Sequence, residues 1–177
     1  QLLVIEDAAQ AIATPYGESY LGGIGDIGVI SFDRQKNVTC SQGGLVIVNN
    51  PNLFDAAEKI YENGTDKAAF LRGEIDAFTW QQPGANFHLS EVAAAYLLPQ
   101  LEQLDSIISH RRMLWDTYYH ELQPMAEKGF FELPQLSDNH NGHIFFLFSD
   151  KRNKLIQHLA AESIHATFHY IPLHSSP

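Results

Sequence analysis

Residues 4–10 read VIEDAAQ, an apolar run that ends in two carboxylates, and residues 27–32 read IGVISF. Continuous apolar runs are typical of sheet strands that are covered on both faces. We therefore expect residues 2–5 to form a central strand and residues 27–32 to form a second strand. The polar residues Asp7, Ser31 and Lys36 come at or after these strand ends. Ligands of open α/β sheets bind at this position.

The chain between these strands and beyond them is divided by glycine and proline. We expect loops at residues 15–26 and 33–43, a strand at 45–48, and a long connection at 63–87. Asn50 followed by Pro51 predicts a helix to about residue 62. Ser90 with Glu91 predicts a helix to about residue 122, which Pro99 should kink or split.

The last third of the chain has a different pattern. It predicts a strand at 143–148, a helix at 151–162 and a strand at 166–171, which together resemble a small α+β unit. We place a domain boundary between residues 105 and 106. Residues 1–105 are then the C-terminal part of a large mixed-sheet domain, and residues 106–177 a small α+β domain. The predicted fold class is α/β.

Composition excludes several classes of protein. Apolar residues make up 45% of the 177 residues and charged residues 18%, which is typical of a folded globular chain. The formal net charge is −10, so we expect neither a nucleic-acid partner nor an anionic membrane partner. No apolar run reaches the roughly 20 residues of a membrane span. The single cysteine, Cys40, fits a reducing cytoplasm.

Asp7, Ser31 and Lys36 together outline a site for pyridoxal phosphate (PLP). A carboxylate can keep the pyridinium nitrogen protonated, a hydroxyl can donate to the phosphate, and a lysine amine can form a Schiff base with the aldehyde. Other roles remain open from spacing alone. A strand-end Asp can be a turn residue or a helix cap, and a loop lysine can be a solvated charge.

A longer pattern resembles the DegT family of nucleotide-sugar aminotransferases. It comprises VIEDAAQA at residues 4–11, GGIGDIGVISF at 22–32, Lys36-Asn37, Gly43-Gly44 before a strand, and GANF at 84–87. The resemblance implies part of a PLP-dependent transferase fold. It also implies that the family's preceding half and its closing C-terminal element are absent from the fragment. The apolar run that opens the chain likewise indicates a start inside a domain.

The resemblance assigns roles to individual residues. Lys36 holds the cofactor and moves the substrate proton, Asp7 pairs with the pyridinium nitrogen, and Gln10 contacts the ring or its 3-hydroxyl. Ser31 binds the phosphate. Asn86 reaches the phosphate of the neighbouring subunit, which implies a homodimer with shared active sites.

Several stretches resemble one subgroup, the dTDP-4-amino-4,6-dideoxygalactose transaminases of enterobacterial common antigen synthesis. They are ENGT at 62–65, FLRG at 70–73, and FHYIPLH at 168–174. This resemblance implies a dTDP-linked keto sugar as acceptor, glutamate as donor, and His169, Tyr170 and His174 near the sugar. Arg72 either contacts a nucleotide diphosphate or lies on the surface.

The sequence departs from the family pattern beside the lysine and beside the asparagine. Asp33-Arg34-Gln35 and Ser41-Gln42 replace the usual neighbours of Lys36, and His88 replaces an arginine. The alternative function is a catalytically inactive fragment or a dimerisation remnant of the same fold, and the presence of Lys36 favours the enzyme. Relatives that dehydrate sugars have another residue in place of this lysine, so the presence of Lys36 argues against that reaction. The nine histidines form no His-Glu-x-x-His motif, so we predict no metal site.

Overall fold

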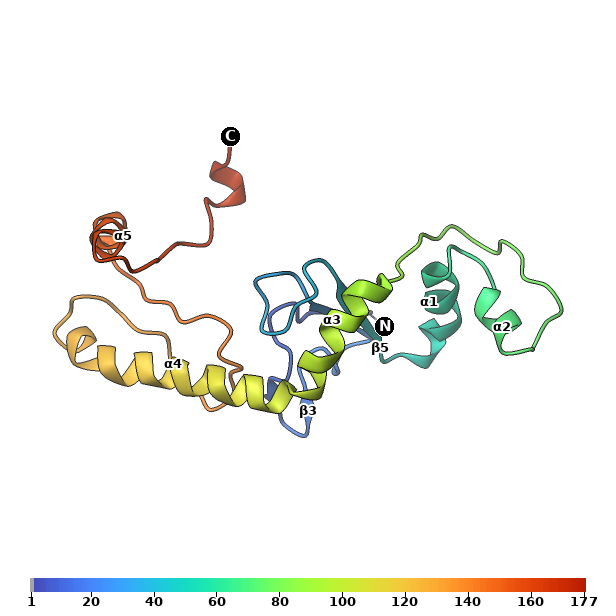
Figure 1. The fold of residues 1–177 in the computed structure, drawn as a ribbon, viewed down its shortest axis with the longest axis horizontal. Helices are drawn as coiled ribbons and strands as arrows, with labels where there is room; N and C mark the ends of the chain where they lie inside the picture. The colour runs from blue at the N-terminus through green and yellow to red at the C-terminus, as the bar shows by residue number, and fades with distance from the viewer. Residues whose placement is uncertain (1) are drawn as a thin grey trace. The chain divides into compact units, whose positions relative to one another are not determined.

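A computed structural model describes residues 2–177 and divides them into two compact units (Figure 1). Unit 1 contains residues 2–116 and 137–144, and unit 2 contains residues 117–136 and 145–177. The domain boundary expected at residues 105–106 falls in the first turn of the helix α4 (Leu104–Ala126) and stays a prediction.

A three-stranded mixed sheet forms the centre of unit 1. Its order is β1 (Ile5–Asp7), β4 (Ile27–Ser31), β5 (Gly44–Val48), with β1 parallel and β5 antiparallel to β4. Asp7 pairs with Val29 and Ser31 pairs with Gly44. Parallel strands end at the same edge of a sheet. Asp7 and Ser31 therefore emerge at one edge.

The prediction of a central strand at residues 2–5 was wrong. The strand begins at Ile5, because pairing with β4 starts at Ile5 and Ile27 and the preceding residues have no partner strand. β4 is the central strand, and β1 lies at the sheet edge among the described residues. The side chains at positions 2–5 are more than half exposed.

The expected loop at residues 15–26 contains a short hairpin, which corrects the sequence reading. Strands β2 (Pro15–Tyr16) and β3 (Ser19–Tyr20) pair antiparallel across a two-residue turn. Gly17 in that turn has φ +59°, a left-handed conformation that glycine adopts without steric cost. A two-residue turn is too short for the hairpin to be recognised from the pattern of polar residues.

Asn50 and Pro51 start a helical segment at the predicted position. The Asn50 side chain accepts the Asn52 N–H, and Pro51 opens a 3₁₀ turn, η1 (Pro51–Leu53), which leads into α1 (Phe54–Tyr61). The expected connection at 63–87 holds one further helix, α2 (Lys67–Leu71). Its five residues are too few to show helical periodicity.

The long helical segment divides at a different residue from the expected one. Ser90 caps α3 (Glu91–Glu102) by accepting the Ala93 N–H at 3.2 Å, as predicted. Pro99 stays inside α3, and the break comes at Gln103, before α4. Leu104 and Ile107 pack against the core beside Leu97 of α3. This packing gives a tertiary reason for a change of direction at Gln103, which residue propensity does not reveal.

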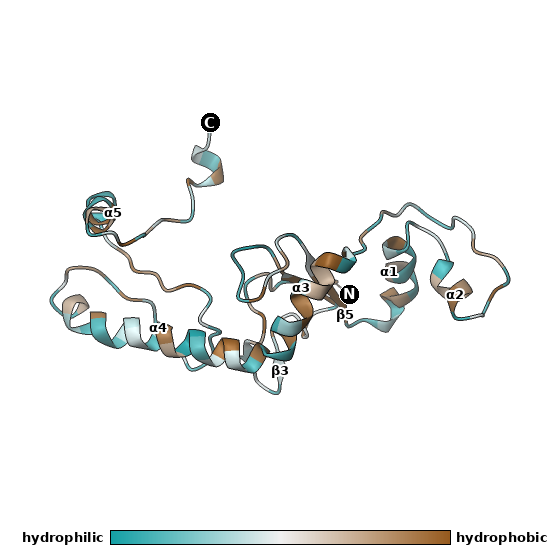
Figure 2. Ribbon diagram, viewed as in Figure 1, coloured by the Kyte–Doolittle hydropathy of each residue, from teal (hydrophilic) through white to brown (hydrophobic). Residues whose placement is uncertain are grey.

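The core of unit 1 joins the sheet to α3 and to the loop after β4. Its buried members are Ala8, Ile30, Phe32, Val38, Cys40 and Leu97. Apolar residues also recur along other faces of α3 (Figure 2), where Val92 and Tyr96 remain exposed.

Unit 2 contains less regular structure than expected. The predicted helix is present as α5 (Arg152–Ala161), and a 3₁₀ turn, η2, covers Leu173–Ser175. The strand predictions at 143–148 and 166–171 were wrong. Only Phe148 pairs, with Glu132, in an isolated bridge, and strands require a longer run of backbone partners. Within residues 2–177, no helix is long and apolar enough to span a bilayer.

Candidate functional site

Two adjacent carboxylates at the end of β1 have different surroundings. Glu6 accepts main-chain N–H groups from Gly22 at 2.9 Å, Ile24 at 2.6 Å and Gly25. These bonds, with that from Gly25 the strongest, lower the pKa of Glu6. Asp7 is exposed at the strand end, and only its Oδ1 is engaged, by the Ala9 N–H at 3.2 Å. Glu6 therefore organises the loop at residues 22–25, whereas Asp7 can receive a ligand.

Lys36 lies in a loop that follows β4 and is closed by main-chain hydrogen bonds. Phe32 and Gly43 are bonded at its base, Cys40 N–H donates to Phe32, and Lys36 N–H donates to Asp33 at 2.9 Å. The Lys36 side chain is half-buried. Its ammonium makes no hydrogen bond or ion pair with the residues that the structure describes.

Residues just after Lys36 anchor this loop. Val38 is fully buried, and the Gln100 side chain of α3 pairs with both main-chain groups of Thr39. Asn37 is buried and donates from Nδ2 to the Asn141 carbonyl oxygen at 2.9 Å. The main chain that carries Lys36 is thus held from two sides.

Asn141 also holds the segment that contains Gln10. Its Nδ2 donates to the carbonyl oxygens of Gln10 at 2.8 Å and Ile12 at 3.0 Å. Asn37, Gln100 and Asn141 were not predicted as functional residues. The Lys36-Asn37 pair was part of the quoted motif, but no local signal connects it to residues more than sixty positions away.

Ser31 stands at the base of the Lys36 loop. Its Oγ accepts the Asp33 N–H at 3.3 Å, which leaves the hydroxyl proton available for donation. A carboxylate at Asp7, a hydroxyl at Ser31 and an unpaired amine at Lys36 match the pyridinium, phosphate and aldehyde groups of PLP in chemistry. The donor set of unit 1 therefore fits this cofactor.

Asn86 lies in the connection between α2 and α3. It is exposed, pairs with Glu62 in an isolated bridge, and accepts the His88 N–H at its side-chain oxygen. His88 Nε2 lies 3.2 Å from the buried carboxylate of Glu62, and Lys67 Nζ lies 3.5 Å from it. His88, which stands where the family has an arginine, thus pairs with Glu62 at the C-terminal end of α1.

His169, Tyr170 and His174 belong to unit 2 and are exposed. The rings of His169 and Tyr170 meet edge to face, with centroids 4.9 Å apart. Their proposed position near the sugar stays a prediction.

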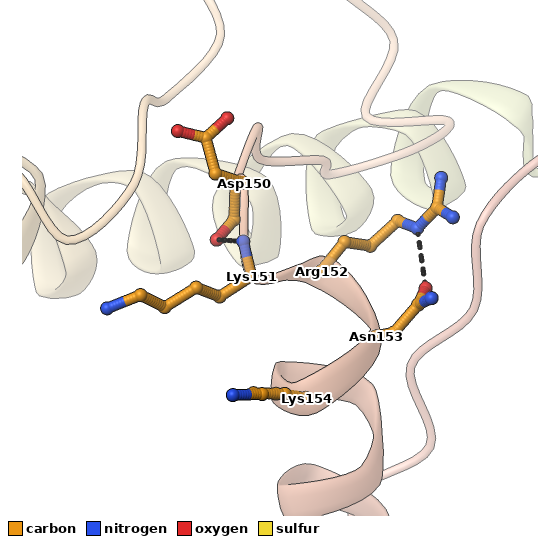
Figure 3. Close-up of a pocket in the computed structure, with 6 residues that line it drawn as sticks. Asp150, Lys151, Arg152, Asn153 and Lys154 are labelled. Atoms are coloured by element: carbon orange, nitrogen blue, oxygen red, sulfur yellow. Dashed lines mark hydrogen bonds between the residues drawn. The ribbon is translucent and has the colours of Figure 1, made fainter.

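A shallow pocket in unit 2 surrounds the start of α5 (Figure 3). Six consecutive residues, 149–154, line it, including the charged residues Asp150, Lys151, Arg152 and Lys154. Arg152 bonds to Asn153 and lies over the Phe168 ring. None of the residues predicted for the cofactor or the sugar lines this pocket, so it does not mark the candidate site.

Arg72, for which a nucleotide contact or a surface position was expected, has two carboxylate partners. Arg72 binds Glu58 through both terminal nitrogens, at 2.6 and 3.0 Å, and binds Glu74 at 2.8 Å. These carboxylates raise the pKa of its guanidinium and occupy its donors.

Cys40 is buried, and burial raises the pKa of its thiol, which disfavours the nucleophilic thiolate. Among residues 2–177, no three His, Cys, Asp or Glu side chains are placed to hold a metal.

The chain is similar in sequence to known proteins. A sequence profile described as "DegT/DnrJ/EryC1/StrS aminotransferase family" matches residues 1–177. GDP-perosamine synthase of Escherichia coli O157:H7 is 30% identical over 184 residues, covering 99% of this chain and 46% of that protein.

Two solved structures have the same fold. DesV of S. venezuelae, solved with a ketimine intermediate, is 29% identical with a TM-score of 0.82 over 99% of this chain and 45% of that one. The PLP form of the putative sugar aminotransferase Spr1654 from Streptococcus pneumoniae is 20% identical with a TM-score of 0.79. That match covers 97% of this chain and 44% of that one, and it shows the fold alone.

The fold and the donor set define part of a PLP-dependent transferase. The chain belongs to the DegT/DnrJ/EryC1/StrS aminotransferase family, whose members use PLP. This confirms the predicted fold class and the predicted cofactor of the family. The chain spans slightly less than half the length of the curated relative that it matches.

Proposed function

We propose that the protein containing this chain transfers an amino group from glutamate to the keto carbon of a nucleotide-linked sugar. The observation that carries the proposal is the placement of Lys36. Its ammonium is unpaired, on a loop with a fixed main chain, and the loop leaves the same sheet edge as Asp7. A family of aminotransferases provides the reaction class.

Each residue of the site would have one task. Lys36 would bind the cofactor covalently and carry the proton that moves during transfer. Asp7 would hold a proton at the pyridine nitrogen, Gln10 would contact the ring or its 3-hydroxyl, and Ser31 would donate to the phosphate. When bound, PLP supplies an electron sink for the substrate carbon.

The unpaired Lys36 also argues against an inactive dimerisation remnant. A lysine kept for structure would be expected to pair with a carboxylate or to lie fully in solvent. Lys36 is instead half-buried without a partner. This state suits an amine that reacts with a ligand.

Two nucleotides are supported for the sugar. The stretches at residues 62–65, 70–73 and 168–174 favour a dTDP-linked 4-keto-6-deoxyglucose, for surface polysaccharide synthesis, whereas the matched relative is named for GDP-perosamine. We favour the dTDP sugar and place His169, Tyr170 and His174 near it. Steady-state kinetics with glutamate and either a dTDP-linked or a GDP-linked keto sugar would decide. A kcat/KM higher for the GDP sugar would overturn the preference.

Assembly and location follow from the same proposal. Asn86, exposed and far in sequence from Lys36, would reach the phosphate of the neighbouring subunit, so the active species is a homodimer. The buried free thiol of Cys40 is consistent with a cytoplasmic protein.

Lys36 provides the direct test. The protein should show a visible absorbance band with PLP, and borohydride should fix the cofactor to Lys36, as peptide mass spectrometry would show. Lys36→Ala should lose the band, the attachment and amino transfer. Lys151→Ala, a loop lysine in unit 2, is the matched control and should keep all three. Unchanged turnover in Lys36→Ala would refute the proposal.

A further inference from the structure

We propose that Asn37, Asn141 and His143 are positioning residues that fix the main chain at Gln10 and at Lys36 relative to each other. We call these three residues the Asn141 junction. The inference rests on the proposed function, because it assigns the junction a role in the geometry of the cofactor site. None of the three side chains is assigned a contact with the cofactor.

The hydrogen bonds of the junction run to both segments that carry the site. Toward the β1 side, Asn141 Nδ2 donates to the carbonyl oxygens of Gln10 and Ile12. Toward the lysine side, the Asn141 carbonyl oxygen accepts from Asn37 Nδ2 at 2.9 Å. One residue therefore bonds to the main chain of Gln10 and to the direct neighbour of Lys36.

His143 contacts both asparagines of the junction. Its Nδ1 lies 2.9 Å from Asn37 Oδ1, and its main-chain N–H donates to Asn141 Oδ1 at 3.1 Å. Asn37 uses its nitrogen on a carbonyl oxygen, so its oxygen must face a donor. The Nδ1 of His143 is then the protonated nitrogen. Both amides thus have a defined orientation.

Burial and close packing constrain the junction. Asn37 and Asn141 are buried, with 8% and 5% of their surface exposed. A buried amide that loses its partners pays the full cost of desolvation. Behind Asn141, Gly142 has φ +64°, and a Cβ there would lie 2.6 Å from the main chain of Arg111 on α4. Trp115 of α4 donates to the carbonyl oxygen of Ile144 at 3.0 Å.

These contacts give α4 a structural route to the site. The helix bonds to Ile144 and lies close against Gly142, both just after Asn141. Asn141 in turn bonds to Gln10 and to Asn37. The Lys36 amine and the Gln10 side chain must meet one rigid cofactor, and small misplacements of reacting groups cost large factors in rate. A common anchor removes the independent movement of the two loops.

The test uses Asn141→Asp in the protein that contains this chain. Aspartate has the same size and keeps the acceptor for the His143 N–H, but it places an oxygen against the carbonyl oxygens of Gln10 and Ile12. Asn37→Asp likewise keeps the acceptor for His143 and loses the donor to Asn141. Asn139→Asp is the control, because it makes the same chemical change on the same segment at an exposed amide without a hydrogen bond.

Three measurements are expected to respond together. Hydrogen exchange in the cofactor-free protein should accelerate at residues 8–14 and 33–43 in both junction variants. The pH midpoint of the visible band of cofactor bound at Lys36 should move by about half a pH unit or more, because its charged surroundings are displaced. The kcat should fall about tenfold or more, with KM for the sugar changed by less than about twofold. Asn139→Asp should match the wild type.

The outcomes separate this inference from the proposed function. A wild type without a band at Lys36 would refute the proposed function itself. A normal wild type, with junction variants that leave the exchange rates and the pH midpoint unchanged, would overturn only the positioning role. Loss of the folded state in both variants, judged by circular dichroism, would show a general structural role and would also overturn it.

Discussion

The side-chain amide of Gln100 pairs with the main chain of Thr39 at both of its ends. Its Oε1 accepts the Thr39 N–H at 3.0 Å, and its Nε2 donates to the Thr39 carbonyl oxygen at 2.8 Å. The Gln100 side chain on α3 thereby makes the two hydrogen bonds that a neighbouring strand would make in a sheet. Its partner Thr39 is a loop residue three positions after Lys36. The loop is held without any sheet partner at that position.

Gln100→Glu should destabilise the protein. The glutamate keeps an acceptor for the Thr39 N–H but leaves the Thr39 carbonyl oxygen without its donor, which costs about 1–3 kcal/mol. Urea unfolding measures this loss. Gln103→Glu, the same change at an exposed amide without a hydrogen bond, should alter stability by less than about 0.5 kcal/mol. Equal stability of the two variants would show that the Gln100 pair contributes nothing.

Asp7→Asn should slow amino transfer by about 100-fold or more, equivalent to about 3 kcal/mol in the barrier. The amide is isosteric and still accepts from Ala9, but it cannot hold a proton on the ring nitrogen by charge pairing. Single-turnover kinetics with glutamate would measure the effect. Glu18→Gln, an exposed carboxylate of the β2–β3 turn, is the control. Wild-type rates in Asp7→Asn would restrict this strand end to a structural role.

Shared active sites predict complementation between two inactive variants. Lys36→Ala and Asn86→Ala homodimers should each be impaired, since one lacks the lysine and the other lacks the neighbour's phosphate contact. In a mixed dimer, one site retains both residues. Random pairing should therefore restore about a quarter of the wild-type activity. Refolded mixtures of the two purified variants would show this, and activity no higher than that of the separate proteins would contradict a shared site.

The stability of unit 1 should decline in acid through two carboxylates. Main-chain N–H groups lower the pKa of Glu6, and the Val4 N–H followed by the Asn50 amide lowers the pKa of Asp26. A folded-state pKa below the unfolded one gives stability above the unfolded pKa. That stability is lost as the pH falls through the lowered value. The loss should therefore occur below about pH 4.

Glu6→Gln isolates one of these carboxylates. The variant should be less stable than the wild type at neutral pH, and its midpoint of urea unfolding should fall less steeply below about pH 4. Glu18→Gln again serves as the control. Identical pH profiles for the wild type and Glu6→Gln would show that the Gly22–Gly25 contacts do not depend on the charge.

Several features of the fold follow from neighbouring residues alone. Asn50 and Ser90 cap the helices that their side chains predict, because a cap needs only the next three residues. The apolar run at residues 27–32 formed β4, and the motif around Lys36 identified the family. These signals are local, so they can be read without a fold.

Other features depend on partners that are distant in the chain. Ile5 rather than Leu2 starts β1, because a strand begins where β4 offers main-chain groups to pair with. Residues 166–171 have the apolar pattern of a strand but lack such a partner in the described structure. The Asn141 junction brings residues 10, 37 and 141 together through hydrogen bonds that span more than 100 positions. Such contacts cannot be predicted from the local sequence. Their energy arises only when the folded chain buries the amides against distant carbonyl groups.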